Sequence, residues 1–475
     1  MDHMIAVDTG GAVPLVTQIF EAMAEKIDNG DLRGGARLPS VRRLAEQCGV
    51  STLTVSNAYN RLVAQGYLEA RRANGYFVSG RPRPTGRQSE PRKLPARAAS
   101  VDSLWLLQRV YEDEKAVLRP GCGWLPESLV FADGIKQALT TVAKKPNVAF
   151  TRYGNPLGYA PLRRQIQLLL AHRHIDCDAK RIVLTQGASQ ALDLAARALL
   201  QPGDTALVDD PGYCNLFPAL WAMGVKMVGV ERTPQGPDLY MLELLARQHR
   251  PKVFFTNTNL HNPTGTSCSP AVVYRILRLA EECDFHVVED DFSADLVAET
   301  AQSVASLDQL RRVIYIGSFS KSISPTLRVG FLAGNDEVVE RVLYHKMAGG
   351  LTSSELTEQV AHAILVEGHH RLHLARLCER LTLAQETVCK GLASAGLTIF
   401  HRPTGGMFVW AGFGLRTDVV EVAKQAAAKG IMLAPGYLFR PDQQPTPWLR
   451  FNVAQADDPR LYRFLDEVSS RHAEA

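Results

Sequence analysis

Apolar residues follow two different spacings in the first 80 residues of the chain. Over residues 15–27, 41–45 and 51–62 they recur at the spacing of a helix face, which predicts three short helices. Turn-forming and capping residue types, Gly, Pro and Ser, stand between these stretches. Residues 66–78 alternate apolar and polar positions around a glycine, which is typical of a two-stranded hairpin. Helix, helix–turn–helix and hairpin, in this order, make up the layout of a winged helix.

The larger part of the chain alternates short apolar runs with helical patterns. The runs predict strands at 182–185, 206–208, 253–256, 286–288, 313–316 and 329–333. Helical spacing separates most of them, for example at 189–200 and 270–283. This alternation predicts an α/β domain with a mostly parallel sheet. Beyond about Asp336 the pattern is mainly helical, and strands at 407–410 and 448–453 predict a smaller α+β lobe.

Residues 81–100 separate the two patterns. They hold four prolines, five arginines, one lysine and one acid without apolar periodicity, which predicts an extended, flexible linker. A chain of 475 residues is long enough for two or more domains of ~100–200 residues each. We therefore expect a winged helix over residues 12–80, a linker over 81–114 and a large domain over 115–470.

Composition excludes several classes of protein. Hydrophobic residues make up 46% of the chain and charged residues 21%, as in a soluble globular protein. No run of ~18 apolar residues predicts a membrane span, and the acidic start of the chain lacks the apolar core of a secretory signal. The eight cysteines lie far apart with no C-x-x-C pair, which favours reduced thiols over disulfides or a zinc site. We expect a cytoplasmic protein.

The net charge of +4 is unevenly distributed. Residues 1–100 hold 14 lysines and arginines against 9 acids, a net charge of +5. The rest of the chain holds 39 against 40, a net charge of −1. A basic module on a near-neutral body favours a polyanionic partner for that module, although a solvated basic linker gives the same balance.

Short polar side chains gather at the predicted start of the third helix, and basic ones stand near the second helix and the hairpin. Those suited to reaching base edges are Ser51, Thr52, Thr54, Ser56 and Asn57. Those suited to holding phosphates are Arg42, Arg43, Arg71 and Arg72. Ser and Thr at a helix start are often only caps. The order of elements, the basic hairpin and the local charge together favour DNA binding.

The N-terminal motifs resemble the GntR-type winged helix. They run from Leu-Pro-Ser-Val-Arg-Arg-Leu-Ala at 38–45 through Val-Ser-x-x-Thr-Val at 50–55 to Tyr-x-x-Leu at 59–62 and Gly-Tyr-Leu at 66–68. The resemblance covers about residues 12–79. It implies operator DNA contacts from the motif arginine, the start of the third helix and the wing glycine. Carried onto this sequence, these positions are Arg42, Ser51, Thr52, Thr54, Ser56 and Gly75.

A lysine directly after an apolar strand indicates chemistry in the large domain. Ser318-Phe319-Ser320-Lys321 follows the strand at 313–316, and Arg328 lies further on. Such a lysine can form a Schiff base with a carbonyl cofactor, while hydroxyls and an arginine can hold a phosphate dianion. A lone lysine is most often a solvated surface residue. Four further motifs favour the cofactor site.

Two of these motifs suit the two ends of a phosphorylated ring. Thr-Gln-Gly-Ala-Ser-Gln at 185–190 joins a strand to a helix, where backbone N–H groups can close on a phosphate, although any tight turn can use glycine. Glu-Asp-Asp at 289–291 ends a strand, where a carboxylate can keep a pyridine nitrogen protonated. Paired acids could instead bind a divalent metal, which we favour less because no nucleotide-phosphate loop accompanies them.

The other two motifs suit the ring itself. His-Asn-Pro-Thr-Gly at 261–265 is either a simple turn or the source of an amide donor to a ring oxygen. Asp-Pro-Gly-Tyr at 210–213 ends a strand, and its tyrosine could either stack on an aromatic cofactor or pack in the core.

In this chain order the motifs resemble fold type I pyridoxal 5'-phosphate (PLP) enzymes of the aspartate aminotransferase class, over roughly residues 115–470. The resemblance implies PLP as cofactor and Lys321 as its Schiff-base lysine. It implies Asp290 at the pyridine nitrogen, Asn262 at the ring hydroxyl and Tyr213 stacked on the ring. The implied phosphate-binding residues are Gly187, Ala188, Ser189, Ser318 and Arg328, with Tyr153 reaching the phosphate of a neighbouring subunit. Arg450, in Trp-Leu-Arg-Phe at 448–451, is implied to bind the substrate α-carboxylate.

A GntR-type winged helix joined to an aminotransferase-like domain resembles the MocR subfamily of bacterial regulators. Gly-x-Gly-Trp-Leu-Pro at 121–126 is a further match, and the resemblance implies a head-to-tail homodimer. Two positions depart from the pattern: Phe292 replaces a tyrosine, and Asn215 replaces the arginine of some members. The lost phenol donor counts against efficient transamination more than against PLP binding. The effectors of members with the arginine do not carry over.

The sequence thus predicts an N-terminal winged helix-turn-helix and a fold type I PLP-binding α/β domain that act together as a transcriptional regulator. The winged helix binds operator DNA, and the large domain senses an amino compound or PLP itself. One alternative is a working aminotransferase whose winged helix is secondary. Another is a DNA-binding module whose cofactor site is vestigial.

Overall fold

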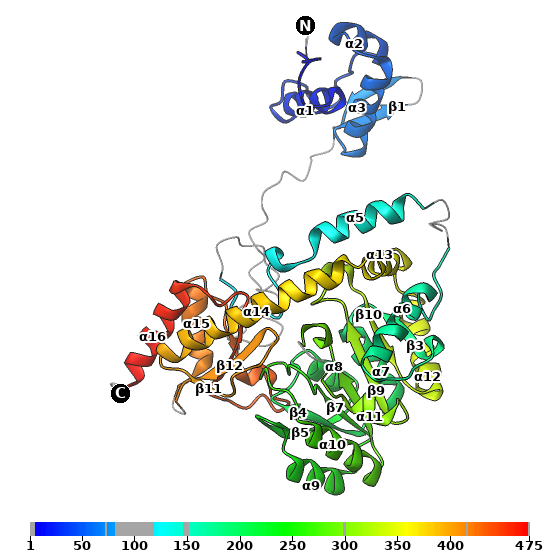
Figure 1. The fold of residues 1–475 in the computed structure, drawn as a ribbon. Helices are drawn as coiled ribbons and strands as arrows, with labels where there is room; N and C mark the ends of the chain where they lie inside the picture. Colours follow the sequence, from blue (N-terminus) through cyan, green and yellow to red (C-terminus); the bar gives the residue numbers. More distant parts are fainter. Residues whose placement is uncertain are drawn as a thin grey trace. The chain divides into compact units, whose positions relative to one another are not determined.

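The structure, a computed structural model, describes residues 5–71, 74–80, 118–145, 152–297, 301–414 and 417–473. The chain divides into two compact units, Met1–Ser100 and Val101–Ala475 (Figure 1). The predicted linker over 81–114 lies outside the described residues, so the exact domain boundaries stay a prediction.

The N-terminal unit has the predicted order of elements. Three helices are followed by an antiparallel hairpin, with the bounds α1 Leu15–Asp28, α2 Val41–Cys48, α3 Thr52–Ala64, β1 Leu68–Arg71 and β2 Gly75–Val78. Arg37 adds an isolated bridge to Phe77 of β2. The helix, helix–turn–helix and hairpin predictions are therefore confirmed.

Local chemistry explains the turn between α2 and α3. The hydroxyls of Ser40 and Ser51 cap the two helices, accepting from backbone N–H groups at 3.3 and 3.0 Å. Gly49 lies between them at φ 65°, which glycine adopts without steric cost. The Tyr59 side chain of α3 is fully buried and donates its hydroxyl to the Pro39 carbonyl at 3.0 Å. This contact fixes α3 against the start of α2.

The second unit is built on an eight-stranded sheet in the order β3-β10-β9-β8-β7-β4-β5-β6. The strands are β3 Ile182–Thr185, β4 Thr205–Asp210, β5 Lys226–Thr233, β6 Gly236–Pro237, β7 Val253–Thr256, β8 His286–Asp290, β9 Val313–Ser318 and β10 Gly330–Ala333. The neighbouring strands β5, β4, β7, β8 and β9 pair in parallel, whereas β10 is antiparallel to both β3 and β9. The mostly parallel sheet is confirmed.

Strands β5 and β6 were not predicted from the sequence. They form one edge of the sheet, and β5 begins with the exposed Lys226 and is mostly half-buried. The apolar stretch of β5, Met-Val-Gly-Val at 227–230, is interrupted by a glycine and followed by three polar residues, so it is a weaker strand signal than the runs of the central strands.

Helices cover both faces of this sheet, as Figure 1 shows. One core contains residues of α5 Ala132–Ala143, α6 Ala160–His172, α9 Leu239–His249, α10 Pro270–Glu282, α11 Val304–Asp308 and α13 Glu355–Val366. The other contains residues of α7 Ala188–Leu199, α8 Leu216–Ala222 and α12 Asp336–Gly350. Successive residues of a strand feed opposite cores: Val287 of β8 packs in the first and Val288 in the second. Burial on both faces explains the apolar runs.

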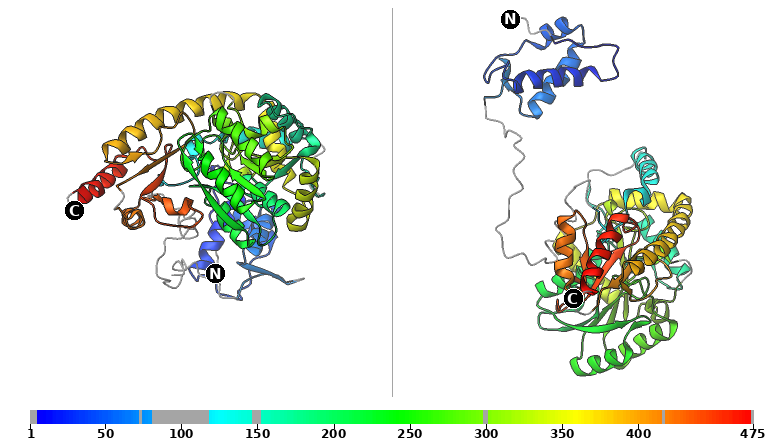
Figure 2. Two further views of the ribbon diagram at one scale, coloured as in Figure 1. Left: turned by 90° about the horizontal axis from the view of Figure 1, so that it is seen from below. Right: turned by 90° about the vertical axis from the view of Figure 1, so that its left-hand side faces the viewer.

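The predicted smaller lobe is also present. Its antiparallel sheet has the order β11-β12-β14-β13, with bounds β11 Thr398–Ile399, β12 Phe408–Gly412, β13 Ala434–Pro435 and β14 Trp448–Asn452. Its helices are α14 His369–Ser394, α15 Val419–Ala428 and α16 Pro459–Ala473. Figure 2 shows the long helix α14, in gold, running between this lobe and the larger sheet.

Short 3-10 segments complete the second unit: η1 Glu127–Leu129, η2 Ala179–Arg181, η3 Ala294–Leu296, η4 Pro325–Leu327 and η5 Gly436–Phe439. Within the described residues, no helix combines the length and apolar character that a membrane span needs.

Candidate functional site

A cavity of about 620 Å³ lies between the end of the large sheet and the small lobe. Nine of the predicted site residues line it: Ala188, Ser189, Tyr213, Asn262, Asp290, Ser318, Lys321, Arg328 and Arg450. The position follows from topology, because ligands of open α/β sheets bind outside the carboxyl ends of the strands.

Parallel pairing brings these side chains together. Asp290 is the last residue of β8 and Ser318 the last residue of β9, with Lys321 shortly after it. Tyr213 follows the end of β4, and Asn262 follows the end of β7. Strands β4, β7, β8 and β9 are parallel neighbours, so their carboxyl ends meet at one edge of the sheet.

Lys321 lines the cavity, and a backbone carbonyl holds its amine. Its Nζ donates to Gly123 O at 2.5 Å. Burial lowers the pKa of Lys321 to about 8, and the positive charges of Arg450 and Arg328 act in the same direction. A pKa of about 8 leaves about a tenth of the amine neutral at pH 7, far more than for a solvated lysine, and the neutral form is the one that attacks a carbonyl.

Asp290, which also lines the cavity, is buried. Its Oδ1 has no hydrogen-bond partner within the described residues. Burial, reinforced by the negative charge of Asp291, raises the pKa of Asp290 to about 7. A protonated pyridine nitrogen would satisfy this oxygen and favour its ionised form. The unpartnered carboxylate therefore fits the ring nitrogen of PLP.

Close packing at the start of α7 brings a guanidinium to the phosphate side. The Arg328 Nη2 donates to Gln186 O at 2.7 Å. Gly187 adopts φ 80°, and a Cβ built on it would lie 2.8 Å from that Nη2. Only glycine meets both demands without a shift of its neighbours. Gly187 thus lies against Arg328 behind the cavity lining, and the pair fits a phosphate at a helix N-terminus.

Hydroxyl and amide groups lie near Arg328 and the start of α7 in the cavity lining. The Ser189 Oγ and Tyr213 OH are 3.2 Å apart, and Asn215 Nδ2 donates to Tyr213 OH at 3.1 Å. Ser318 Oγ donates to Ser320 Oγ at 3.0 Å. Asn215, at the position where the resemblance implies an arginine in some members, thus contacts Tyr213.

Arg450 is buried between two aromatic rings. Its Cζ lies 4.7 Å from the ring centroids of both Phe408 and Phe439. Its Nη1 donates to Asn262 Oδ1 at 2.9 Å, and its Nη2 donates to Gly121 O at 2.7 Å. The Nε has no partner within the described residues. The Arg450 guanidinium is held in place by these contacts and still has donor capacity that would suit a carboxylate.

Tyr153 and Phe292, both singled out from the sequence, lie in different places relative to the cavity. Tyr153 is 82% exposed and does not line the cavity, so its contact with a neighbouring subunit stays a prediction. Phe292 does line the cavity, and its ring centroid lies 6.5 Å from that of Phe408. The position therefore contributes apolar surface where the family pattern has a phenol.

Sequence reasoning missed the part of the wall formed by residues 121–124. The Gly-x-Gly-Trp pattern was noticed there, but its contribution is made by backbone carbonyls, which side-chain chemistry does not reveal. Asn452 of β14 holds the segment by donating to Trp124 O at 2.7 Å. The result is that Gly121 and Gly123 face the cations Arg450 and Lys321.

The predicted DNA-binding residues lie on the surface of the N-terminal unit. Arg42, Ser51, Thr52 and Gly75 are exposed, while Thr54 and Ser56 are half-buried. The Ser51 Oγ lies 2.8 Å from Thr54 Oγ1 and also caps α3. These two hydroxyls therefore have a structural task beside any DNA contact.

Comparison with known proteins assigns the two units of the chain to two families. Residues 15–78 match the gntR family of bacterial regulatory proteins, and residues 131–468 match class I and II aminotransferases. The transcriptional regulator TauR of Rhodobacter capsulatus is 30% identical over 90% of each chain. The regulatory protein MocR of Rhizobium meliloti is 27% identical over 91% of this chain and 88% of its own.

A solved structure supports the same assignment for the second unit. LysN, an α-aminoadipate aminotransferase from Thermus thermophilus complexed with N-(5'-phosphopyridoxyl)-L-leucine, superposes with a TM-score of 0.71 and 25% identity. The match covers 78% of this chain and 95% of LysN.

The chain thus belongs to the class I and II aminotransferase family, whose fold implies PLP as cofactor. Joined to its gntR-type domain, this domain makes the chain a member of the MocR type of helix–turn–helix transcriptional regulators.

The raised pKa of Asp290 predicts a pH-dependent stability of the cofactor-free protein. A carboxyl whose folded-state pKa is raised gives stability that is present at low pH and lost as the pH rises through about 7. Asp290→Asn removes this proton linkage. We expect the unfolding midpoint of the variant to fall less between pH 5 and 8 than that of the wild type.

Glu289, whose pKa burial also raises to about 7, leaves a residual slope in the variant. The same substitution at Asp133, whose side chain is 96% exposed on α5, is the matched control and should keep the wild-type slope. If the unfolding midpoints of Asp290→Asn and the wild type fell equally with pH, the raised pKa of Asp290 would be refuted.

Proposed function

We propose that this regulator binds operator DNA through its winged helix and senses an amino compound, or PLP itself, in its second unit. Lys321 holds the cofactor covalently, Asp290 faces the ring nitrogen, Asn262 the ring hydroxyl and Tyr213 the ring face. The phosphate is bound by Ser318, Arg328 and the turn of residues 187–189. Arg450 binds the effector carboxylate.

One observation carries the proposal: a DNA-binding domain and a cavity containing both Lys321 and an unpartnered Asp290 oxygen belong to the same chain. When bound, PLP supplies a carbonyl for amines and a ring that accepts electrons. The amide orientation of Asn262 supports its part. Its Oδ1 accepts from Arg450, which leaves Nδ2 to donate to a ring oxygen.

Regulation requires two global states of the protein. The effector must bind these two states with different affinities, and so must the operator. We place this coupling in a cytoplasmic homodimer with head-to-tail arrangement, in which Tyr153 of each subunit reaches the phosphate of the other. The high exposure of Tyr153 is compatible with such a contact.

A working aminotransferase is the second candidate, favoured by the presence of both Lys321 and a preorganised Arg450 in the cavity. Phe292 counts against it, because no phenol stands there to tune the proton balance of the cofactor. Turnover of an amino donor and a keto acid at the rate of a dedicated enzyme would favour this candidate.

Removing the lysine tests the cofactor assignment. We expect Lys321→Ala to lose the visible absorbance of lysine-linked PLP and to resist covalent fixation of PLP by borohydride, because Lys321 is the one lysine among the described residues that line the cavity. Lys424→Ala, a change on the exposed side of α15, should behave as wild type. Intact operator response without lysine-linked PLP would instead support the vestigial-site alternative.

Removing a basic side chain tests the DNA face. We expect Arg42→Ala to weaken operator binding and to reduce the slope of log affinity against log salt by about 1, because one phosphate contact is lost. The absorbance of bound PLP should not change. Arg463→Ala makes the same change in net charge on α16 and should leave the salt slope intact. Unchanged operator affinity in Arg42→Ala would refute the contact.

A further inference from the structure

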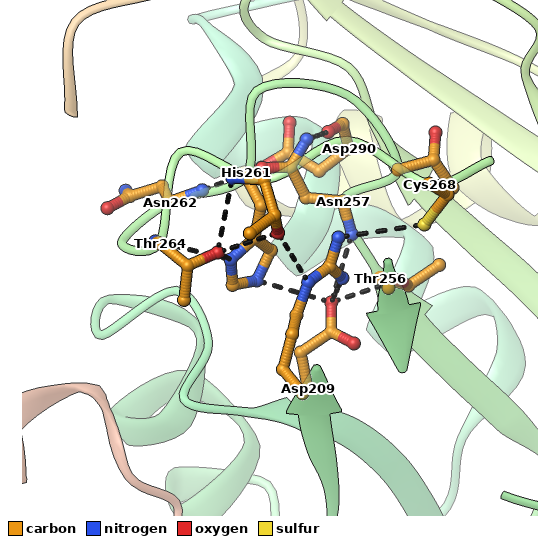
Figure 3. A network of polar contacts seen from close by, with 12 residues as sticks. Asp209, Thr256, Asn257, His261, Asn262, Thr264, Cys268 and Asp290 are labelled. Atoms are coloured by element: carbon orange, nitrogen blue, oxygen red, sulfur yellow. Dashed lines mark hydrogen bonds and ion pairs between the residues drawn. The ribbon is translucent and has the colours of Figure 1, made fainter. Parts of the chain in front are cut away.

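Asn257 lies directly after β7, between the two residues proposed to hold the PLP ring, and no role was predicted for it. Figure 3 shows its side chain between Asp290 and Asn262, within a network that also includes Asp209 and His261. The residue is 7% exposed and does not line the large cavity.

The Asn257 amide is fully used. Its Nδ2 donates to the backbone carbonyls of Asp290 and Asn259, both at 2.8 Å. Its Oδ1 accepts from the backbone N–H of Asn262 at 2.9 Å. Both hydrogens and the oxygen therefore have partners, and the three partners fix which way the amide points. One side chain thus connects the end of β8 to the turn that carries Asn262.

The backbone of Asn257 is anchored in turn by a buried ion pair. Its N–H donates to Asp209 Oδ2 at 3.1 Å, and Arg232 Nη1 reaches the same oxygen at 2.9 Å. Thr256 Oγ1 donates to it at 2.9 Å, and His261 Nε2 lies 3.4 Å away. The Arg232 side chain is 0% exposed. Several donors on one buried oxygen make an anchor that is costly to displace.

The charges in this anchor are well defined. Burial alone would raise the pKa of Asp209, but Arg232 and His261 outweigh it and lower that pKa, so the carboxylate is ionised. Burial and the charge of Arg232 lower the pKa of His261 to about 4, so its imidazole is neutral. The anchor therefore keeps the same charge across the neutral pH range.

The network continues into the small lobe. Asn262 Oδ1 accepts from Arg450 Nη1 at 2.9 Å, so the turn held by Asn257 also orients the proposed carboxylate clamp. A displacement of Asn257 would move the Asp290 backbone, the Asn262 amide and the Arg450 guanidinium together. Partners of binding groups act in this way, because small errors of orientation weaken every contact at once.

We infer that Asn257 is a positioning residue that sets the spacing between Asp290 and Asn262, and through Asn262 the orientation of Arg450. This inference rests on the proposed function, since it assumes that these three residues hold PLP and the effector. It goes beyond that function by assigning the PLP affinity and the geometry of the clamp to a residue that touches neither ligand.

The sharpest test is the near-isosteric substitution Asn257→Asp. It keeps an oxygen for the Asn262 N–H but replaces the Nδ2 donor with an oxygen facing the carbonyls of Asp290 and Asn259. We expect PLP affinity to fall at least about tenfold in an absorbance titration, because a buried donor is exchanged for a repulsive acceptor.

The matched control is Asn335→Asp. Asn335 also donates Nδ2 to a backbone carbonyl, Arg311 O at 2.9 Å, and accepts from a backbone N–H, Val338 at 2.9 Å. It caps α12 away from the cavity lining. The chemical change is the same, so PLP affinity should stay within about twofold of wild type if position decides the effect.

A double-mutant cycle separates positioning from general destabilisation. If Asn257 acts through Asn262, Asn257→Asp should weaken PLP binding less in an Asn262→Ala background than in the wild type. Additive losses would indicate a structural role unrelated to Asn262 and would overturn the inference. Asn257→Ser, which retains one small donor, repeats the test should the aspartate variant not fold, with an expected smaller loss of affinity.

The outcomes distinguish this inference from the proposed function. If wild-type protein takes up no PLP, or takes it up without Lys321, the proposed function fails. If wild-type protein binds PLP through Lys321 while Asn257→Asp and Asn335→Asp bind it equally well, the function stands and the positioning role is refuted.

Discussion

Parallel pairing of β4, β7, β8 and β9 is the constraint on which the rest of the site depends. Each strand is buried on both faces, so the residues within it are mostly apolar and pack in the two cores. The polar residues of the site therefore lie at or after the ends of the strands. Because the strands run in one direction, their ends meet at one edge. Tyr213, Asn262, Asp290 and Lys321 share a cavity for this reason, although they come from four separate segments.

Burial then gives the cavity its electrostatic character. The same loss of water lowers the pKa of Lys321 to about 8 and raises that of Asp290 to about 7, so both pKa values lie near physiological pH. Among the described residues, Lys321 and Asp290 do not form an ion pair with each other. The amine rests on Gly123 O, and one Asp290 oxygen has no partner in the part of the chain that the structure describes. A ring carrying both a carbonyl and a protonated nitrogen would satisfy the two groups together.

The small lobe and the edge of the sheet complete the site from outside. Arg450 comes from β14, yet its direction is fixed by Asn262 of the large sheet and by the Gly121 carbonyl. On the other side, Asp209 and Arg232 form a buried pair behind Asn257. Asn262, the Asp290 backbone and Arg450 thus lie within one polar network that joins both lobes through Asn257.

The sequence by itself determined the three helices and hairpin of the first unit, the central strands and the motifs at their ends. These features are local: a capping serine, a helical spacing or an apolar run acts on its own neighbourhood. Only the tertiary structure decided how Gly121, Gly123 and Asn257 contribute, because backbone carbonyls have no residue identity and an amide between two loops has no sequence pattern. Strand β5, near the edge of the sheet, was missed because its partly solvated sequence carries only a short apolar stretch interrupted by Gly229. The pKa values of Lys321 and Asp290 were equally beyond the sequence, because burial is a property of all the residues that surround a group.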